Sequence, residues 1–161
     1  MGCAASSALS DQYVLINDVV LPGRQGNIDH VLVGPSGVAI IETKNYSGTI
    51  FCTGDRWFRK RIPIRSPSLQ AKAQAASLRD FLADKITGTR DVIRYVQRVV
   101  VFTNPRVRLE VRNSTIPAVR FSELLDLVIE LGKRRALSPE GVDRVSQCVL
   151  NWARVMDRRS K

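Results

Sequence analysis

The stretch that decides the fold is Ile28-Asp29-His30-Val31-Leu32-Val33-Gly34-Pro35-Ser36-Gly37-Val38-Ala39-Ile40-Ile41-Glu42-Thr43-Lys44-Asn45. Two apolar segments flank Gly34-Pro35-Ser36-Gly37, where proline fixes one backbone angle and glycine supplies the other. This connection predicts a tight hairpin between two antiparallel strands. The second segment is almost wholly apolar until its end, which is typical of a strand in the middle of a sheet.

Three charged side chains interrupt this apolar hairpin. Asp29 lies five residues before Gly34 and Glu42 lies five residues after Gly37, so both are expected at one level of adjacent strands, with Cβ atoms roughly 4.5–5.5 Å apart. Lys44 follows Glu42 by two positions and is expected on the same face. Charges in an apolar strand are costly unless they are paired or bound to a metal. The pattern favours a shared divalent cation over its alternative, a structural ion pair of Lys44 with Glu42 or Asp29.

Two carboxylates beside an ammonium group suit metal-assisted hydrolysis of a phosphodiester. Hard oxygen ligands hold Mg²⁺ and leave coordination positions open for water and phosphate. A metal held in this way polarises the phosphate and helps to ionise a water. The ammonium group stabilises the growing negative charge or positions the attacking water.

The rest of the chain predicts a mixed α/β domain with a central sheet. Strands are expected at 12–20, 28–33, 38–44, 49–53, 56–61, 96–102 and 116–120, and helices at 69–86, 122–131 and 139–156. Serines precede each expected helix as caps: Ser66 or Ser68, Ser122 and Ser138. The expected organisation is a flexible leader at 1–11, one domain at 12–156 and a basic tail at 157–161.

The charge balance indicates a polyanionic partner. The 161 residues include 25 basic and 15 acidic side chains, which gives a formal net charge of +10. Most of the basic residues are arginines, whose planar donors match phosphate oxygens. Nucleic acid is the first expectation, ahead of an anionic membrane or a merely solvated basic surface. The densest basic run supplies the predicted phosphate contacts, Arg56, Arg59, Lys60, Arg61 and Arg65.

Other features exclude several classes of protein. Three cysteines without a CxxC spacing argue against a disulfide framework or a zinc cluster and favour a cytoplasmic location. No apolar run approaches the ~18 residues that span a bilayer, and no small-molecule cofactor is expected. Gly2 followed by Ser6 matches the myristoylation pattern, which leaves an acylated, membrane-associated protein as a third hypothesis.

Several motifs together resemble the nuclease-related domain family, a branch of the PD-(D/E)XK nuclease superfamily. The resemblance covers about residues 13–131. It rests on Asn17-Asp18-Val19, Ile28-Asp29-His30-Val31-Leu32-Val33, Gly37-Val38-Ala39-Ile40-Ile41-Glu42-Thr43-Lys44-Asn45-Tyr46-Ser47-Gly48, Trp57, Ser66-Pro67, Gln70 and Val99-Val100-Val101-Phe102-Thr103-Asn104.

This resemblance implies a restriction-endonuclease-like central mixed sheet flanked by helices, and a Mg²⁺-dependent deoxyribonuclease in which Mn²⁺ can substitute. Asp29 and Glu42 would be metal ligands, and the carbonyl of Thr43 would complete the metal's shell. Lys44 would be the catalytic lysine. Gln70, on the following helix, would face the site and hold a water or a phosphate.

One departure from the family pattern supports an alternative function. Domains of this family usually open with a helix that carries a metal-facing glutamate, and no glutamate precedes Glu42 here. The alternative is a non-catalytic nucleic-acid-binding module that keeps the fold.

Two further residues each allow two interpretations. For His30 a packing and hydrogen-bonding role is favoured over a catalytic one, and Trp57 is expected either to stack on a base or to cover a sheet edge.

Overall fold

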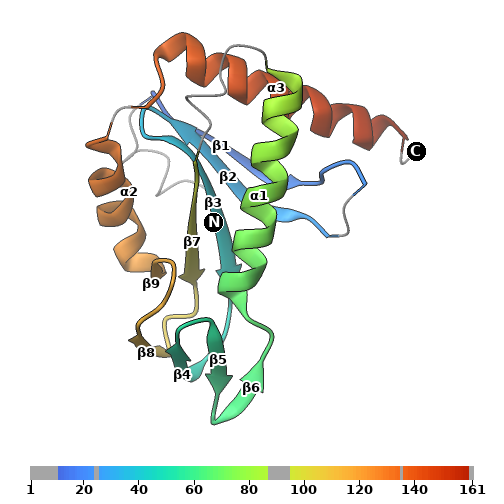
Figure 1. Cartoon of the computed structure of the whole chain (residues 1–161). Helices are drawn as coiled ribbons and strands as arrows, with labels where there is room; N and C mark the ends of the chain where they lie inside the picture. Colours follow the sequence, from blue (N-terminus) through green and yellow to red (C-terminus); the bar gives the residue numbers. More distant parts are fainter. Residues whose placement is uncertain (1–10, 24–25, 87–94, 135, 160–161) are drawn as a thin grey trace.

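The part of the chain that the structure describes forms two sheets and three α-helices (Figure 1). A computed structural model describes residues 11–23, 26–86, 95–134 and 136–159, with side chains as far as Trp152. A five-stranded sheet carries helices on both faces, and a four-stranded sheet lies at one end of it. Each sheet combines parallel and antiparallel pairs. The predicted α/β fold with a central mixed sheet flanked by helices is therefore confirmed.

The larger sheet contains the hairpin that was expected to decide the fold. Its strand order is β1 (Val14–Val19), β2 (Ile28–Gly34), β3 (Gly37–Lys44), β7 (Val96–Phe102) and β9 (Ala118–Arg120). The pairs β1–β2 and β2–β3 are antiparallel, whereas β3–β7 and β7–β9 are parallel. β3 is the central strand, as its continuous apolar sequence predicted.

Successive side chains along each strand point to opposite faces of the larger sheet, and both faces are buried. Val31 and Ile40 belong to a core cluster with residues of α1 (Pro67–Lys85) and α3 (Pro139–Arg159). Leu32 and Ile41, one residue further along each strand, pack against α2 (Leu124–Gly132) on the other face. Because side chains alternate along a strand, Asp29, Glu42 and Lys44 fall on the face that α1 covers.

The smaller sheet extends the domain beyond the end of β3. Its order is β6 (Ile62–Ile64), β5 (Arg56–Arg59), β4 (Gly48–Thr53) and β8 (Val107–Arg112). Its inner face packs Ile50 and Trp57 against Phe102 and the start of α1 in a separate core cluster. The rings of Trp57 and Phe102 are stacked, with centroids 5.6 Å apart.

One pair of chain segments runs side by side through both sheets. Val38 pairs with Val96 in the larger sheet, and Gly48 pairs with Val107 in the smaller one, both in parallel register. The segment that contains β3 and β4 therefore follows the segment that contains β7 and β8 from one sheet into the other. Lys44 lies at the last paired position of the first ladder, opposite Phe102.

The helix starts follow the sequence in two of three cases. Ser66 caps α1 and its side chain accepts a hydrogen bond from the Leu69 amide, and the Ser138 hydroxyl accepts one from Gly141 at the start of α3. The predicted cap at Ser122 is wrong. The Glu123 carboxylate accepts from the Arg120 amide and a 3₁₀ turn, Phe121–Glu123, forms first, so α2 begins at Leu124.

Other boundaries differ from those expected. β8 was not predicted, and the strand expected at 116–120 is limited to Ala118–Arg120. The basic segment expected at 56–61 divides into β5 and β6 around a turn, and α3 continues to Arg159, beyond its expected end at 156. The expected leader, with Gly2 and Cys3, lies outside the described residues except for Asp11. No described helix combines the length and apolar character that a membrane span needs.

Candidate metal and phosphate site

Asp29 and Glu42 lie opposite each other at the open end of the β2–β3 hairpin. His30 pairs with Ile41 in antiparallel register, so the next level outward places Asp29 beside Glu42. Both belong to the face that α1 covers. The Coulomb repulsion of Asp29 acts on Glu42 and contributes to raising its pKa. The hairpin register predicted from the sequence thus brings the two carboxylates together.

Asp29 is fixed by the strand that carries Glu42. Its Oδ2 atom accepts hydrogen bonds from the Thr43 amide at 2.9 Å and from the Thr43 hydroxyl at 2.7 Å. Both hydrogen bonds end on the same oxygen, which leaves Oδ1 available to a cation. The observed role of Thr43 is therefore to orient Asp29. Its expected role as a carbonyl ligand to the metal stays a prediction.

Lys44 joins the strand site to α1. Its Nζ atom donates to Glu42 Oε1 at 2.6 Å and to Gln70 Oε1 at 3.4 Å. Gln70 lies in the first turns of α1, where the Ser66 cap and Pro67 fix the start of the helix. The structure therefore gathers Asp29, Glu42, Lys44 and Gln70 in one place.

The environment of Glu42 is unusual for a carboxylate. The residue is 1% exposed. Burial raises the pKa of Glu42 above its ordinary value, and the hydrogen bond and charge of Lys44 offset only part of that rise. Its second oxygen, Oε2, is buried and has no hydrogen-bond partner. A buried carboxylate oxygen without a partner is costly in a protein interior, and a bound cation would satisfy it.

Gln74 is a further residue beside Glu42 that was not among the predicted site residues. It lies one helical turn after Gln70, and its side chain acts on Glu42 to lower the carboxylate's pKa. Its Nε2 atom donates to the Asn27 carbonyl at 3.0 Å, while its Oε1 atom is buried without a partner. Because residues four apart share a helix face, the spacing from Gln70 was a usable signal. Both glutamines line a cleft of about 490 Å³ that also includes Arg65.

These residues fit a magnesium ion better than a metal with a full protein cage. Asp29 Oδ1 and Glu42 Oε2 are hard oxygen atoms at the same level of adjacent strands. Mg²⁺ is usually held by one or two carboxylates and keeps several of its waters. Among the described residues, no three His, Cys, Asp or Glu side chains gather closely enough to hold a metal. A zinc-type centre therefore does not fit this part of the chain.

His30 and Trp57 have structural contacts. His30 lies on the sheet face opposite Asp29, and its Nδ1 atom is 2.7 Å from Asn17 Oδ1 on the neighbouring strand. Trp57 is 1% exposed, and its indole N–H donates to the Ser68 hydroxyl at 3.0 Å. Of the two interpretations offered for Trp57, stacking on a base is wrong, because the ring is enclosed between the smaller sheet and α1.

A second polar cluster attaches the smaller sheet to α1. Asp55, in the β4–β5 turn, accepts from Ser68 at 2.7 Å and from Lys72 at 2.7 Å, and also accepts from Thr115. Partial burial acts to raise the pKa of Asp55, but these donors prevail and hold it at about 2. The cluster fixes the N-terminal half of α1, which carries Gln70, against the smaller sheet.

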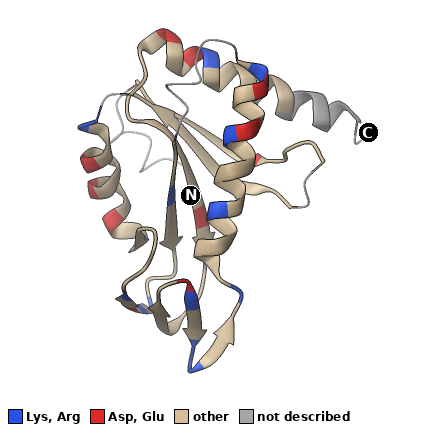
Figure 2. Cartoon of the chain, viewed as in Figure 1, with Lys and Arg blue, Asp and Glu red and all other residues tan. Residues whose placement is uncertain are grey.

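The five predicted phosphate contacts separate into three groups. Arg56, Lys60 and Arg61 are exposed on the smaller sheet and its β5–β6 turn. Arg65 lines the cleft beside Gln70. Arg59 is instead engaged within the chain, since it donates to the Ser47 carbonyl and hydroxyl at 3.2 Å and lies over the Tyr46 ring. Figure 2 shows basic residues on the smaller sheet and acidic residues along α2.

The chain was compared with protein-family models, with curated proteins and with solved structures. A solved structure, SfsA of Pyrococcus furiosus in complex with Ca²⁺, has 12% sequence identity and a TM-score of 0.29, over 77% of this chain and 43% of that protein. The chain thus spans less than half of that protein, and a likeness this low carries no argument. None of the curated proteins compared with the chain matches it significantly. The family model described as "Nuclease-related domain" matches residues 3–103, more than half of the chain, and the chain therefore belongs to the nuclease-related domain family.

Proposed function

We propose that this chain is a metal-dependent nuclease that hydrolyses phosphodiester bonds of DNA at Asp29, Glu42 and Lys44. The proposal rests on three features that lie together at the end of the β2–β3 hairpin. Two carboxylates oppose each other, one carboxylate oxygen is buried without a partner, and an ammonium group lies 2.6 Å from the same carboxylate. Membership of the nuclease-related domain family supports the same class of chemistry.

Asp29 and Glu42 would hold Mg²⁺ or Mn²⁺, with the Thr43 carbonyl as the third protein ligand. The ion would supply Lewis-acid polarisation of the phosphate and a water of lowered pKa. Thr43 orients Asp29 through its two hydrogen bonds. Lys44 places a positive charge where a phosphate would develop negative charge. Gln70 and Gln74 offer amide groups to a water or a phosphate oxygen in the cleft that they line.

The test is cleavage of supercoiled and linear DNA by the purified chain with Mg²⁺, with Mn²⁺ and with EDTA. We expect metal-dependent cutting that Asp29→Ala, Glu42→Ala and Lys44→Ala each abolish, because groups acting on one reacting phosphate are not additive. DNA binding should persist in all three variants, since the arginine-rich surface supplies most of it. His30→Ala is the matched control, because His30 lies on the opposite face of the same strand.

The second candidate is a non-catalytic DNA-binding module. It is favoured by one observation, the absence of a third acidic ligand near Asp29 and Glu42 among the described residues. This alternative expects salt-sensitive DNA binding by the wild-type chain with no cutting in either metal. If the wild-type chain cuts DNA and the Lys44→Ala, Asp29→Ala and Glu42→Ala variants cut it equally well, both candidates are contradicted. The activity would then come from another site or from a contaminant.

A further inference from the structure

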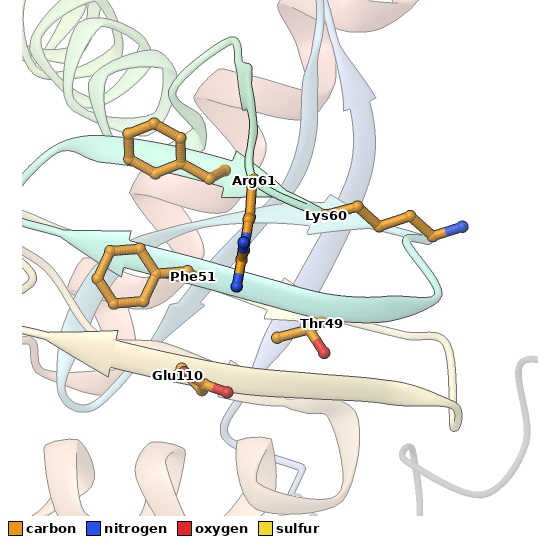
Figure 3. A pocket seen from close by; sticks show the side chains of 6 residues that line it. Thr49, Phe51, Lys60, Arg61 and Glu110 are labelled. Carbon is orange, nitrogen blue, oxygen red and sulfur yellow. The ribbon is translucent and has the colours of Figure 1, made fainter.

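The outer face of the smaller sheet combines aromatic rings with positive charge. Phe51 on β4 pairs with Phe58 on β5, and their ring centroids are 6.1 Å apart. Both rings are only partly buried and belong to none of the three core clusters. They line a hollow of about 690 Å³ together with Thr49, Lys60, Arg61 and Glu110 (Figure 3). We call this surface the aromatic face.

Basic side chains surround the two rings. The strand registers place Arg56 of β5 and both Arg108 and Arg112 of β8 on the same side of the sheet as the phenylalanines. The Arg112 guanidinium lies over the Phe51 ring, 5.9 Å from its centroid. In Figure 3 the Arg61 side chain extends over the sheet toward Phe51. With Lys60 at the edge of the hollow, five basic groups and one carboxylate, Glu110, lie on this face of the described sheet. The aromatic face is therefore complementary to a polyanion.

The turn that supplies Lys60 and Arg61 is strained. These two residues connect β5 to β6 and have φ values of 50° and 66°. Two-residue hairpin turns with positive φ at both positions strongly prefer Asn-Gly or Gly-Gly, because other residues are disfavoured there. The chain instead places two long cations at these positions. Backbone strain of this kind is concentrated at functional sites.

We infer that the aromatic face binds single-stranded DNA, with bases stacked on Phe51 and Phe58 and phosphates contacted by Arg56, Arg61 and Arg112. Aromatic rings that are accessible within a basic surface accept unpaired bases of any sequence. Bases within a duplex are already stacked on one another and cannot reach the rings. The inference deepens the proposed function, on which the choice of DNA as the polyanion rests. It assigns the enzyme a substrate that includes an unpaired strand.

The geometry of the domain favours this placement. β4 follows β3 after only three residues, so the aromatic face begins close to Lys44 in the chain. Arg59 contacts Ser47 in the loop that follows β3, and the Asp55 cluster attaches the smaller sheet to α1. A strand held on the aromatic face would therefore have a fixed position relative to Asp29 and Glu42.

The first test measures binding of fluorescently labelled oligo(dT) by anisotropy in EDTA, with the full chain. We expect Phe51→Leu and Phe58→Leu each to weaken binding roughly fivefold to tenfold, because base stacking on an aromatic ring contributes about that factor or more. An abasic oligonucleotide of equal length keeps the phosphates but lacks bases, and a duplex hides its bases. Binding of both should be unaffected by either substitution.

Phe121→Leu is the matched control, since Phe121 is a solvent-accessible phenylalanine that lies elsewhere, at the start of the 3₁₀ turn before α2. Circular dichroism and thermal melting check that each variant is folded. Equal loss of oligo(dT) and abasic binding in the Phe51 and Phe58 variants, or no loss in either, would overturn the stacking inference.

The second test uses the strained turn. Lys60→Asn with Arg61→Gly introduces the residues that the turn prefers, so the double variant should melt at a higher temperature and yet bind oligo(dT) more weakly. Higher stability with unchanged affinity would remove the turn from the inferred surface. Lys85→Gln, at the far end of α1, is the charge control.

These measurements are independent of cutting. Binding in EDTA that depends on both phenylalanines supports the aromatic face even if the chain cuts no DNA with any metal. If the chain cuts DNA with a metal but its binding of oligo(dT) does not depend on either phenylalanine, the proposed function is retained and the aromatic face is rejected.

Discussion

Replacing Lys44 with methionine separates a catalytic constellation from a structural ion pair. The substitution keeps most of the length of the side chain and removes the charge that lies 2.6 Å from Glu42 Oε1. The Lys44 side chain is 19% exposed and that of Glu42 is 1% exposed. The carboxylate that is left behind therefore has little access to water.

The expected loss of stability follows from that burial. Removal of one partner of a buried ion pair costs about 3–5 kcal/mol, because the other charge is left uncompensated. Glu42 can reduce this cost by taking up a proton, since burial already raises its pKa. We therefore expect a loss near the lower limit, about 3 kcal/mol, and a fall in Tm of roughly 6–12 °C for a domain of this size. Lys44→Met with Glu42→Gln leaves no charge behind and should lose only about 1 kcal/mol.

Divalent cations provide the decisive assay. If Asp29 and Glu42 bind Mg²⁺, the ion should stabilise Lys44→Met by RT ln(1 + [Mg²⁺]/Kd), about 1.4 kcal/mol at ten times Kd. This corresponds to a rise in Tm of roughly 3–6 °C. The same rise should be absent in the double variant, which lacks one carboxylate. Denaturant unfolding and thermal melting with Mg²⁺ or EDTA measure these quantities. A Lys44→Met variant that is as stable as wild type refutes the ion-pair argument, and one that Mg²⁺ does not stabilise refutes the metal site.

Two further predictions concern the basic surface and the Asp55 cluster. DNA affinity should fall steeply between low and physiological salt, because phosphates neutralised by arginine release counterions; a flat response in a salt titration would contradict nucleic-acid binding. Asp55→Asn should cost about 1–2 kcal/mol near neutral pH. Because the pKa of Asp55 is about 2, below its ordinary 3.8, the wild-type advantage is complete above that ordinary value. It should disappear as the pH falls through 2, and a difference in unfolding free energy that is constant with pH would contradict it.

The relative positions of the candidate site residues could be predicted from the sequence more fully than the surface around them. Asp29 and Glu42 lie on two strands that the turn Gly34-Pro35-Ser36-Gly37 connects, so their relative position follows from local hairpin register. The family resemblance implied that Gln70 faces the site from the helix, and its side chain accepts a hydrogen bond from Lys44. Gln74 was accessible from helical spacing alone. The orientation of Asp29 by Thr43 was not predictable, because it depends on which carboxylate oxygen faces the neighbouring strand.

The smaller sheet was harder to predict because one of its pairings, β4–β8, is non-local. Val107–Arg112 alternates apolar and charged residues, which is a strand signal, but nothing nearby in the sequence indicates its partner β4. Without β8, Arg108 and Arg112 could not be placed beside Phe51. For the same reason stacking on a base and covering a sheet edge were equally justified for Trp57, since its enclosure depends on Phe102 and on α1. Arg59 looked like its neighbours until its contacts with Ser47 and Tyr46 were known.

The shared path of two chain segments through both sheets has a consequence for how the domain folds. The β2–β3 hairpin closes a short loop and can form early, whereas β3–β7 and β4–β8 join residues that are 58 and 59 positions apart in sequence. Closing such loops costs chain entropy before any contact repays it, which slows folding. The carboxylates are thus adjacent in an early hairpin, while α1 with Gln70 and the smaller sheet join only when the long-range ladders form. A partly folded chain would present two exposed carboxylates without the surroundings that raise the pKa of Glu42. We therefore expect the candidate site to become complete only when the long-range ladders form.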